Sequence, residues 1–300
     1  MVNMLVMLYS FIMGIVMKRS GRFPSGTANV LNQFIINITF PAVTLLYIHQ
    51  LEFSSGLIFP ALMGIIVFAF GAGFFLIVGK MLKLNDRTIG CLMLSGGLGN
   101  TSFVGFPMIN AFYGEELIGI GVLCDQGSFF VLSTLGIMVA AKYASGRVSS
   151  WEIVQKVLMF PPFQAMALAL ILKPVVFPPW FIDFLRALGA TITPLALASV
   201  GFQLHLGDIK TAYGRLSLGL FYKLIIAPLV IFLLYVFVFG ARGQAIQVTV
   251  FEAAMAPMIT ASIIAAENDL DRPLTALMVG VGIPLSFITA AAWYYLLLWV

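Results

Sequence analysis

Long apolar runs follow one another along the whole chain, separated by short segments that hold most of the charged residues. A helix that crosses a bilayer needs roughly 20 consecutive apolar residues, so each run predicts one spanning helix. We therefore expect an all-α polytopic membrane protein with short loops and no soluble domain. The ten predicted spans cover residues 2–17, 27–48, 56–79, 88–112, 117–141, 157–173, 181–206, 213–239, 244–266 and 273–298.

The composition supports a membrane protein and argues against several other classes. Hydrophobic residues make up 61% of the chain and charged residues 9%, whereas soluble domains carry roughly 25% charged residues. The two cysteines, Cys91 and Cys124, lie in apolar runs and form neither a CxxC motif nor a Cys/His cluster. There is no Walker A motif and no visible set of redox ligands. We expect no enzyme activity, no catalytic residues, no resident metal or cofactor, and no nucleic-acid partner.

The basic residues indicate how the chain is oriented. Thirteen of the 16 lysines and arginines lie in alternate connections, and such residues gather on the cytoplasmic side of a membrane. This predicts an even number of spans in a plasma membrane (a bacterial inner membrane), with both termini outside. The thirteen include Lys223, which we place near the inner end of the eighth span, where a long side chain can reach the interface.

The longest connection on the inner side lies at the middle of the chain. It covers residues 146–156 and contains Ser-Gly and Ser-Ser pairs typical of a linker. Five predicted spans lie on each side of it, in residues 1–145 and 157–300. Because five is odd, the two halves enter the membrane in opposite directions and form inverted repeats.

Prolines recur in the two halves at an offset of about 150 residues. Pro41 in the second span corresponds to Pro194 in the seventh, and Pro107 in the fourth corresponds to Pro257 in the ninth. A proline inside a helix removes a hydrogen bond and clashes with the preceding turn. These four positions therefore predict helix breaks, although proline is also common in membrane helices generally.

The fourth and ninth spans predict a binding site near the middle of the membrane. Residues 95–107 are too rich in glycine for a continuous helix, with Gly99 and Gly105 among the helix-breaking positions. Residues 252–260 interrupt the ninth span at a similar depth. Interrupted helices are tolerated in a bilayer where they are buried in protein or line a cavity. Their half-helix N-termini would suit a carboxylate.

The chain resembles the auxin efflux carrier family, whose bacterial members include malonate and malate permeases. The resemblance rests on Pro41, on residues 99–107 (GNTSFVGFP) and on the Met255-Ala256-Pro257 sequence. It implies a fold shared with bile-acid sodium symporters and sodium/proton antiporters, in which broken helices 4 and 9 cross. Helices 3–5 and 8–10 would then form a moving transport domain and helices 1, 2, 6 and 7 a scaffold. The resemblance implies that the substrate is contacted by Asn100, Thr101, Ser102, Pro107, Met255 and Pro257.

Two acids lie well inside predicted spans and are candidates for ion coupling. A charged side chain at the bilayer centre costs roughly 2.5–3.5 kcal/mol on insertion scales, so retained ones are candidates for function. Glu252 lies one turn before Pro257, and Asp125 lies about one third into the fifth span. Either carboxyl could carry a proton, or Glu252 and Asn100 could hold a sodium ion. Alternatively, Glu252 holds the helix break open and Asp125 lies near the outer interface.

These observations predict a secondary active transporter that moves a small organic anion by an elevator-type mechanism. The expected substrates are carboxylates such as malonate, malate or an auxin-like acid, driven by protons or by the membrane potential. The alternatives are a sodium-coupled symporter of the bile-acid type and a membrane sensor that acts through a partner protein. An intramembrane aspartyl protease is disfavoured because the GxGD motif is absent. The remaining expected partners are membrane lipid and, from the resemblance, a second copy in a homodimer; His49 and His205, near span ends, are given no role.

Overall fold

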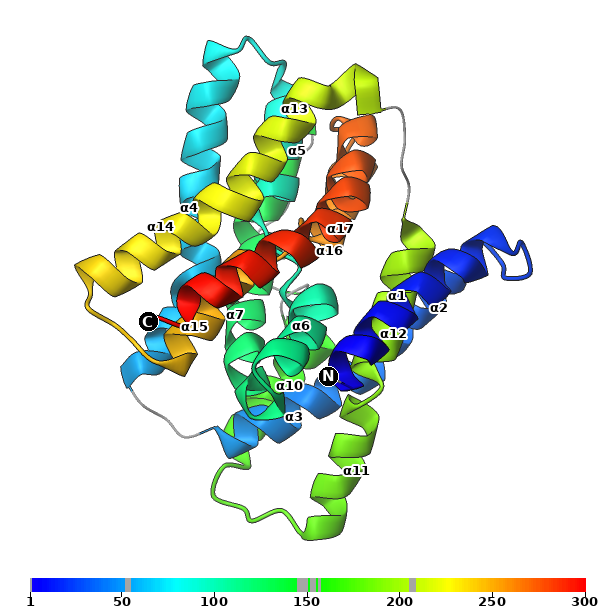
Figure 1. Ribbon diagram of the computed structural model, residues 1–300, viewed down its shortest axis with the longest axis vertical. Helices are drawn as coiled ribbons and strands as arrows, with labels where there is room; N and C mark the ends of the chain where they lie inside the picture. The colour runs from blue at the N-terminus through cyan, green and yellow to red at the C-terminus, as the bar shows by residue number, and fades with distance from the viewer. Residues whose placement is uncertain (1, 52–54, 145–150, 152–154, 156–157, 205–208) are drawn as a thin grey trace. The chain divides into compact units, whose positions relative to one another are not determined.

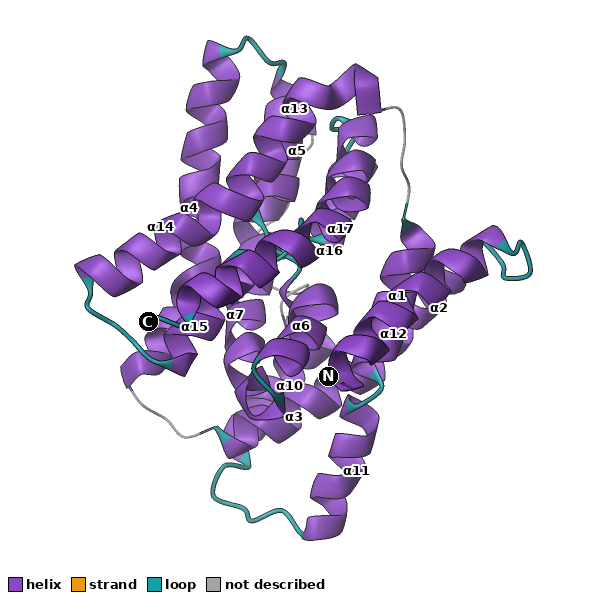
Figure 2. Cartoon of the chain, in the orientation of Figure 1, coloured by secondary structure: helices purple, strands orange, loops and turns teal. Residues whose placement is uncertain are grey.

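The computed structural model describes residues 2–51, 55–144, 151, 155, 158–204 and 209–300. Helices make up 83% of the structure, and no strand occurs among the residues described (Figure 2). The predicted all-α class is therefore confirmed. The predicted linker 146–156, apart from residues 151 and 155, lies outside the described residues, as does His205.

Helices occur in each of the ten predicted segments (Figure 1). In the first half they are α1 (Val2–Arg19), α2 (Thr27–Phe34), α3 (Phe40–Gln50), α4 (Ile58–Met81), α5 (Asp86–Gly97), α6 (Phe106–Phe112), α7 (Ile118–Val131) and α8 (Ile137–Ala144). In the second half they are α10 (Pro161–Ile171), α11 (Pro179–Gly189), α12 (Ile192–Gln203), α13 (Ile209–Phe221), α14 (Ala227–Phe232), α15 (Gln244–Ala253), α16 (Ile259–Glu267) and α17 (Arg272–Leu297). Short 3₁₀ turns cover Ser55–Leu57 and Glu115–Leu117.

Six helical stretches of the described chain are long and apolar enough to cross a membrane. The predicted fourth and ninth spans are each interrupted, so that neither half is long enough alone. The number of ten spans and the inverted repeat stay predictions. The six stretches are Thr27–Gln50, Ile58–Met81, Glu115–Tyr143, Pro179–Gln203, Ala212–Val238 and Arg272–Leu297.

Prolines widen several of these helices instead of ending them. Pro41, Pro107 and Pro228 each lie two residues after a π-helical segment. A proline has no N–H group and its ring displaces the carbonyl of the preceding turn, which favours a wider turn at that place. The three π-helical segments before prolines are Ile35–Thr39, Thr101–Gly105 and Tyr222–Ile226, and two others cover Leu132–Gly136 and Leu233–Val238.

The chain divides into two compact units, and each unit combines segments from both halves of the sequence. Unit 1 comprises residues 1–54, 102–122 and 155–204, and unit 2 comprises residues 55–101, 123–154 and 205–300. The sequence is therefore interleaved between the units. The predicted assignment of helices to a scaffold and a transport domain stays a prediction.

Unit 1 is held together by close contact between α1 and α12, which lie side by side (Figure 1). A Cβ on Gly14 would lie 2.1 Å from the Ala198 carbonyl oxygen, and one on Gly201 would lie 2.1 Å from that of Phe11. The two backbones therefore touch at glycines, as is common in membrane helix pairs. Near the predicted breaks, the Thr39 and Thr191 hydroxyl groups hydrogen-bond at 2.8 Å.

Unit 2 uses buried polar groups of aromatic side chains to tie its helices together. The Tyr222 hydroxyl donates to the Val67 carbonyl at 2.7 Å, and the Tyr235 hydroxyl donates to that of Phe59 at 2.8 Å. The Trp293 indole donates to the Leu224 carbonyl at 3.0 Å. Each acceptor lies on another helical segment, so these bonds fix helix positions as well as satisfying buried polar groups.

Candidate functional site

Two interrupted helices pair with each other inside unit 2. Helix α5 ends at Gly97, and α15 ends at Ala253, before α16 begins at Ile259. The Asn100 N–H donates to the Ala256 carbonyl at 2.7 Å, and the Met258 N–H donates to that of Leu98 at 3.0 Å. Gly99 and Pro257 face each other in this antiparallel bridge. We call residues 98–101 and 254–258 the crossing.

The pairing explains how unwound backbone is tolerated here. Helix ends leave N–H and C=O groups without partners inside the helix, and such groups are costly away from water. Each break supplies partners for the other. The predicted interruptions of the fourth and ninth segments are thus present, but Pro257 pairs with Gly99, whereas Pro107 lies further along, at the start of α6.

Glycines let the backbone and its neighbours approach at the crossing. A Cβ on Gly99 would lie 3.0 Å from Lys223 Nζ and 3.6 Å from the Glu252 carbonyl oxygen. A Cβ on Gly282 of α17 would lie 2.6 Å from the Pro257 ring. Larger side chains at these two positions would press on the breaks themselves.

Lys223 occupies a different place from the one predicted. Its side chain is 1% exposed, and Nζ donates to the Ala253 carbonyl at 2.7 Å. The prediction that it reaches the membrane interface is therefore wrong. Helices α5 and α15 both end beside this ammonium group, and the partial negative charge of helix C-termini favours a cation there.

Glu252 lies on the last turn of α15 and is fully buried. Neither carboxyl oxygen has a hydrogen-bond partner among the residues that the structure describes. The charges of Asp125 and Lys223 lie close enough to act on it. A buried charged carboxyl group without a hydrogen-bond partner is unfavourable in free energy. Binding of a proton or a ligand at this position would lower that cost.

Asp125 lies in α7 and is also buried, with 1% of its surface exposed. It accepts a hydrogen bond from the Thr101 hydroxyl at 2.6 Å. Thr101 is the first residue after the break at Leu98–Asn100. This bond ties the second candidate acid directly to the crossing.

The structure brings some of the predicted site residues together and not others. Asn100, Thr101, Met255 and Pro257 belong to the crossing, with Gly99, and Glu252 and Asp125 lie beside it. Lys223 was missed as a site residue. The other predicted positions lie elsewhere in the chain: Ser102 and Gly105 in a π-helical segment, Pro107 in α6, and Pro41 and Pro194 in the first turns of α3 and α12.

A tight gap, with no room for a water-sized sphere, lies beside the crossing within unit 2. Gly97, Gly99, Ser128, Lys223 and Glu252 are among the residues that line it. The lining therefore combines open backbone, a hydroxyl group and two ionisable side chains of opposite type. Among the described residues, no group of three or more His, Cys, Asp or Glu side chains is placed to hold a metal ion.

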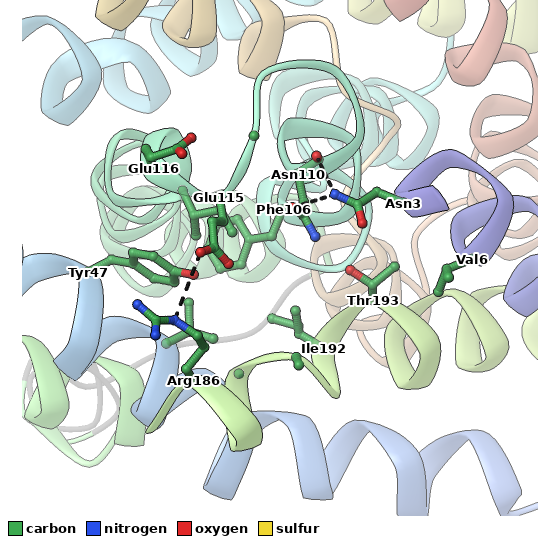
Figure 3. Close-up of a pocket in the computed structure, with 15 residues that line it drawn as sticks. Asn3, Val6, Tyr47, Phe106, Asn110, Glu115, Glu116, Arg186, Ile192 and Thr193 are labelled. Atoms are coloured by element: carbon green, nitrogen blue, oxygen red, sulfur yellow. Dashed lines mark hydrogen bonds and ion pairs between the residues drawn. The ribbon is translucent and has the colours of Figure 1, made fainter. Parts of the chain in front are cut away.

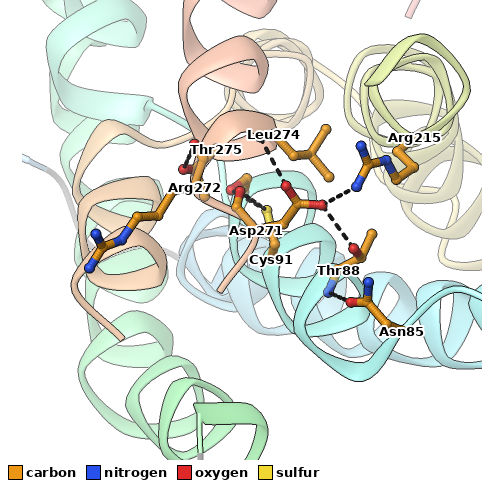
Figure 4. Close-up of polar contacts among 9 residues, drawn as sticks. Asn85, Thr88, Cys91, Arg215, Asp271, Arg272, Leu274 and Thr275 are labelled. Atoms are coloured by element: carbon orange, nitrogen blue, oxygen red, sulfur yellow. Dashed lines mark hydrogen bonds and ion pairs between the residues drawn. The ribbon is translucent and has the colours of Figure 1, made fainter. Parts of the chain in front are cut away.

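A polar cluster at the start of α5 and α17 anchors the helices that lead to the crossing (Figure 4). The Asp271 carboxylate accepts from Arg215 at 2.5 Å and from the Thr88 hydroxyl at 2.8 Å, and it also caps α17 through the Leu274 N–H. Asn85 caps α5 through the Thr88 N–H at 2.8 Å. The cluster joins α5, α13 and α17 by a largely buried ion pair.

Apolar helices of spanning length, together with two interrupted helices that pair inside one unit, define a multi-pass membrane protein. The chain belongs to the membrane transport protein family, whose model matches residues 1–294. This match confirms the resemblance to the auxin efflux carriers. The protein is therefore a membrane transporter.

Two archaeal relatives match over nearly the whole chain. An uncharacterized transporter from Methanocaldococcus jannaschii is 26% identical over 303 residues, covering 98% of this chain and 97% of the relative. An uncharacterized transporter from Methanothermobacter thermautotrophicus is 26% identical over 300 residues, covering 97% and 96%. Neither name specifies a substrate.

Proposed function

We propose that this protein is a secondary active transporter that carries a small carboxylate across the plasma membrane, coupled to protons, with the crossing as its transport site. The observation that carries the proposal is Glu252, a fully buried carboxyl without a hydrogen-bond partner among the described residues, beside Asp125 and Lys223. A group of this kind can change its charge by taking up and releasing one proton. Such groups inside membrane segments mark ion and proton pathways.

The helix ends at the crossing support an anionic substrate. Helix α16 begins directly after Met258, and the helical segment that starts at Thr101 follows Asn100. Helix N-termini carry partial positive charge and favour carboxylates. Asn100, which is 2% exposed, adds an amide at the same place. The substrate class is thus a small mono- or dicarboxylate such as malonate, malate or an auxin-like acid.

Lys223 supports protons over sodium as the coupling ion. A sodium ion at the crossing would need several oxygen ligands, and carbonyl oxygens of broken helices commonly supply them. Here the Ala253 carbonyl already accepts a hydrogen bond from the Lys223 ammonium group. The lysine thus supplies the positive charge that a sodium ion would bring. The sodium-coupled alternative, with Asn100 and Glu252 as ligands, would place a second positive charge beside the Lys223 ammonium group.

An elevator-type motion is consistent with where the site residues lie. The crossing, Asp125, Lys223 and Glu252 all belong to unit 2. A site contained in one compact unit can move with it as a rigid body. We further propose that both termini face outward, because this orientation follows from the basic connections.

The test is uptake of labelled malonate, malate and indole acetate by the full chain in proteoliposomes. We expect saturable uptake of at least one of the three. Asn100→Ala should reduce that uptake at least tenfold, whereas Asn37→Ala, which removes an amide bonded locally to Gln33 in unit 1, should not. Absence of uptake of all three, or equal uptake by Asn100→Ala and the parent chain, would overturn the proposal.

A further inference from the structure

A second hollow is lined by residues of unit 1, and none of these residues belongs to the crossing (Figure 3). Its volume is about 420 Å³. Segments from α1, α3, α6, α7, α11 and α12 and the turn Glu115–Leu117 line it. This volume lies in the range of small-molecule pockets, which are mostly apolar and carry a few placed polar groups.

The lining has this mixed character. Val43, Phe106 and Ile118 provide apolar surface, while Tyr47 and Arg186 provide hydrogen-bond donors. Among the described residues, Arg186 is the one cationic side chain that lines the pocket. Figure 3 shows its guanidinium group beside the Tyr47 ring and the Glu115 carboxylate. An anion placed here would meet a planar cation next to a phenol hydroxyl.

Arg186 is only loosely engaged in the structure. Its Nε lies 3.9 Å from the Glu115 carboxylate oxygen, beyond hydrogen-bond distance, and Nη1 lies 3.4 Å from the Asp183 carboxylate. The Arg186 and Glu115 side chains are 48% and 52% exposed. A guanidinium group offers five N–H donors in a fork that matches a carboxylate. Among the described residues, the Asp183 carboxylate accepts one hydrogen bond from it, and most of its donors are left for another partner.

We propose that this pocket is a docking site for a small carboxylate, in which the ligand replaces Glu115 as the partner of Arg186. The ligand class rests on the proposed function, but the site is separate from the crossing. The Glu115 pair is half exposed, and exposed pairs contribute little stability, so exchanging it costs little. Glu116, the other acid in the lining, points away from Arg186 (Figure 3).

The position of the pocket along the chain fits a docking role on the outer side. Gln50 ends α3 and Gly114 precedes the turn at Glu115, and both lie at the predicted outer ends of their spans. Phe106 and Thr193, which line the pocket, directly precede Pro107 and Pro194. The pocket thus reaches from an outer helix end to the irregular part of two helices.

The experiment measures equilibrium binding of labelled malonate, malate and indole acetate to the purified full chain in nanodiscs. Arg186→Gln should weaken binding about tenfold or more, because hydrogen bonds to charged groups are lost. Glu115→Gln should tighten it roughly two- to fivefold by removing the competing carboxylate. Arg242→Gln is the matched control, since it removes an exposed charge from another predicted outer loop in unit 2 and should leave affinity unchanged.

The same measurement in the Asn100→Ala chain separates this proposal from the proposed function. Binding that persists in the Asn100→Ala chain and still depends on Arg186 supports a separate docking site. This holds whether or not the chain takes up the substrate in proteoliposomes. Equal affinity of Arg186→Gln and its parent, or no saturable binding of any of the three ligands by the Asn100→Ala chain, overturns it. Arg186→Lys, which keeps the charge and loses the fork, should fall between the parent and Arg186→Gln.

Discussion

At the scale of single residues, three ionisable side chains share one buried environment. Asp125 accepts a hydrogen bond from Thr101, Lys223 donates to the Ala253 carbonyl, and Glu252 has no hydrogen-bond partner among the described residues. Buried charges are tolerated when opposite charges compensate them. Two charged carboxyl groups and one ammonium group would carry a net charge of −1. One proton bound to a carboxyl group would neutralise it.

This arrangement predicts energetic coupling between Lys223 and Glu252. Lys223→Met should destabilise the folded chain by about 3–5 kcal/mol, because it leaves Glu252 without its compensating charge. The double variant with Glu252→Gln should lose less than the sum of the two single losses. Thermal unfolding of the four chains in detergent measures the coupling. Strictly additive changes would show that the two side chains do not act on each other.

Glycine positions at the crossing predict a steric effect. Gly282→Ala should destabilise by about 1–3 kcal/mol, because the new methyl group would press on the Pro257 ring. Gly214→Ala in α13 is the matched control, since a Cβ there meets nothing within 4 Å. The control should be neutral or slightly stabilising. Equal melting temperatures of the Gly282→Ala and parent chains would contradict this packing.

The sequence indicates that some of these residues belong to the site, but it does not indicate this for Lys223. Pro257 is recognisable because it lies in an interrupted apolar run, and Gly99 because it lies in a stretch too rich in glycine for a continuous helix. Lys223 was misplaced because its predicted span begins at 213, only a short distance away. Helix α13 begins at Ile209, and 14 residues of helix extend about 21 Å, further than a lysine side chain reaches. An earlier helix start would have predicted the burial.

At the scale of helices, close backbone contacts at glycines and wide π-helical turns accompany the apolar packing. Helices α1 and α12 touch at Gly14 and Gly201, and α4 and α7 touch in a similar way at Gly64 and Gly127. Lipid tails are as apolar as leucine, so helix association in a membrane relies on such close packing. Small residues at these contacts are therefore structural requirements.

Helix packing in unit 1 predicts a strong effect of size at Gly14. Gly14→Leu should separate α1 from α12 and destabilise the chain by several kcal/mol, well above the effect of Gly26→Leu. Gly26 is a suitable comparison because a Cβ there meets nothing within 4 Å. Protease resistance in detergent is the measurement. Similar resistance of the two variants would contradict the α1–α12 contact.

The sequence predicts where helices are irregular better than it predicts which kind of irregularity occurs there. At Pro41 and Pro107, where the prolines predict helix breaks, the structure has π-helical segments that end two residues before them. The prolines do not reveal that Gly99, and not Pro107, pairs with Pro257. Nor do they indicate the π-helical segments at Leu132–Gly136 and Leu233–Val238. Pairing between distant segments depends on tertiary packing, which local sequence does not record.

At the scale of the whole molecule, the chain alternates between two units instead of folding as two consecutive halves. The apolar runs correctly located helices in all ten predicted segments. The distribution of basic residues predicts their orientation, and burial of Lys223 leaves twelve basic residues on the predicted inner side. Only the family resemblance implied an interleaved arrangement of helices. Hydropathy could not imply it, because an apolar run looks the same whether its helix faces lipid or protein.

Topology provides a test at this scale. A cysteine at Arg22 should react with a membrane-impermeant maleimide only from the inside, and one at Arg242 only from the outside. Both native cysteines are fully buried, so the introduced thiol should dominate the labelling of intact cells. Labelling of both positions from the same side would contradict the predicted orientation and the even number of spans.

Proton-coupled transport is tested most directly by accumulation of labelled malate in proteoliposomes, with an imposed pH gradient and no sodium. We predict that the parent chain concentrates malate above its external level and that Glu252→Gln only equilibrates it. This prediction would be contradicted if accumulation required sodium, or if Glu252→Gln accumulated malate as well as the parent chain does.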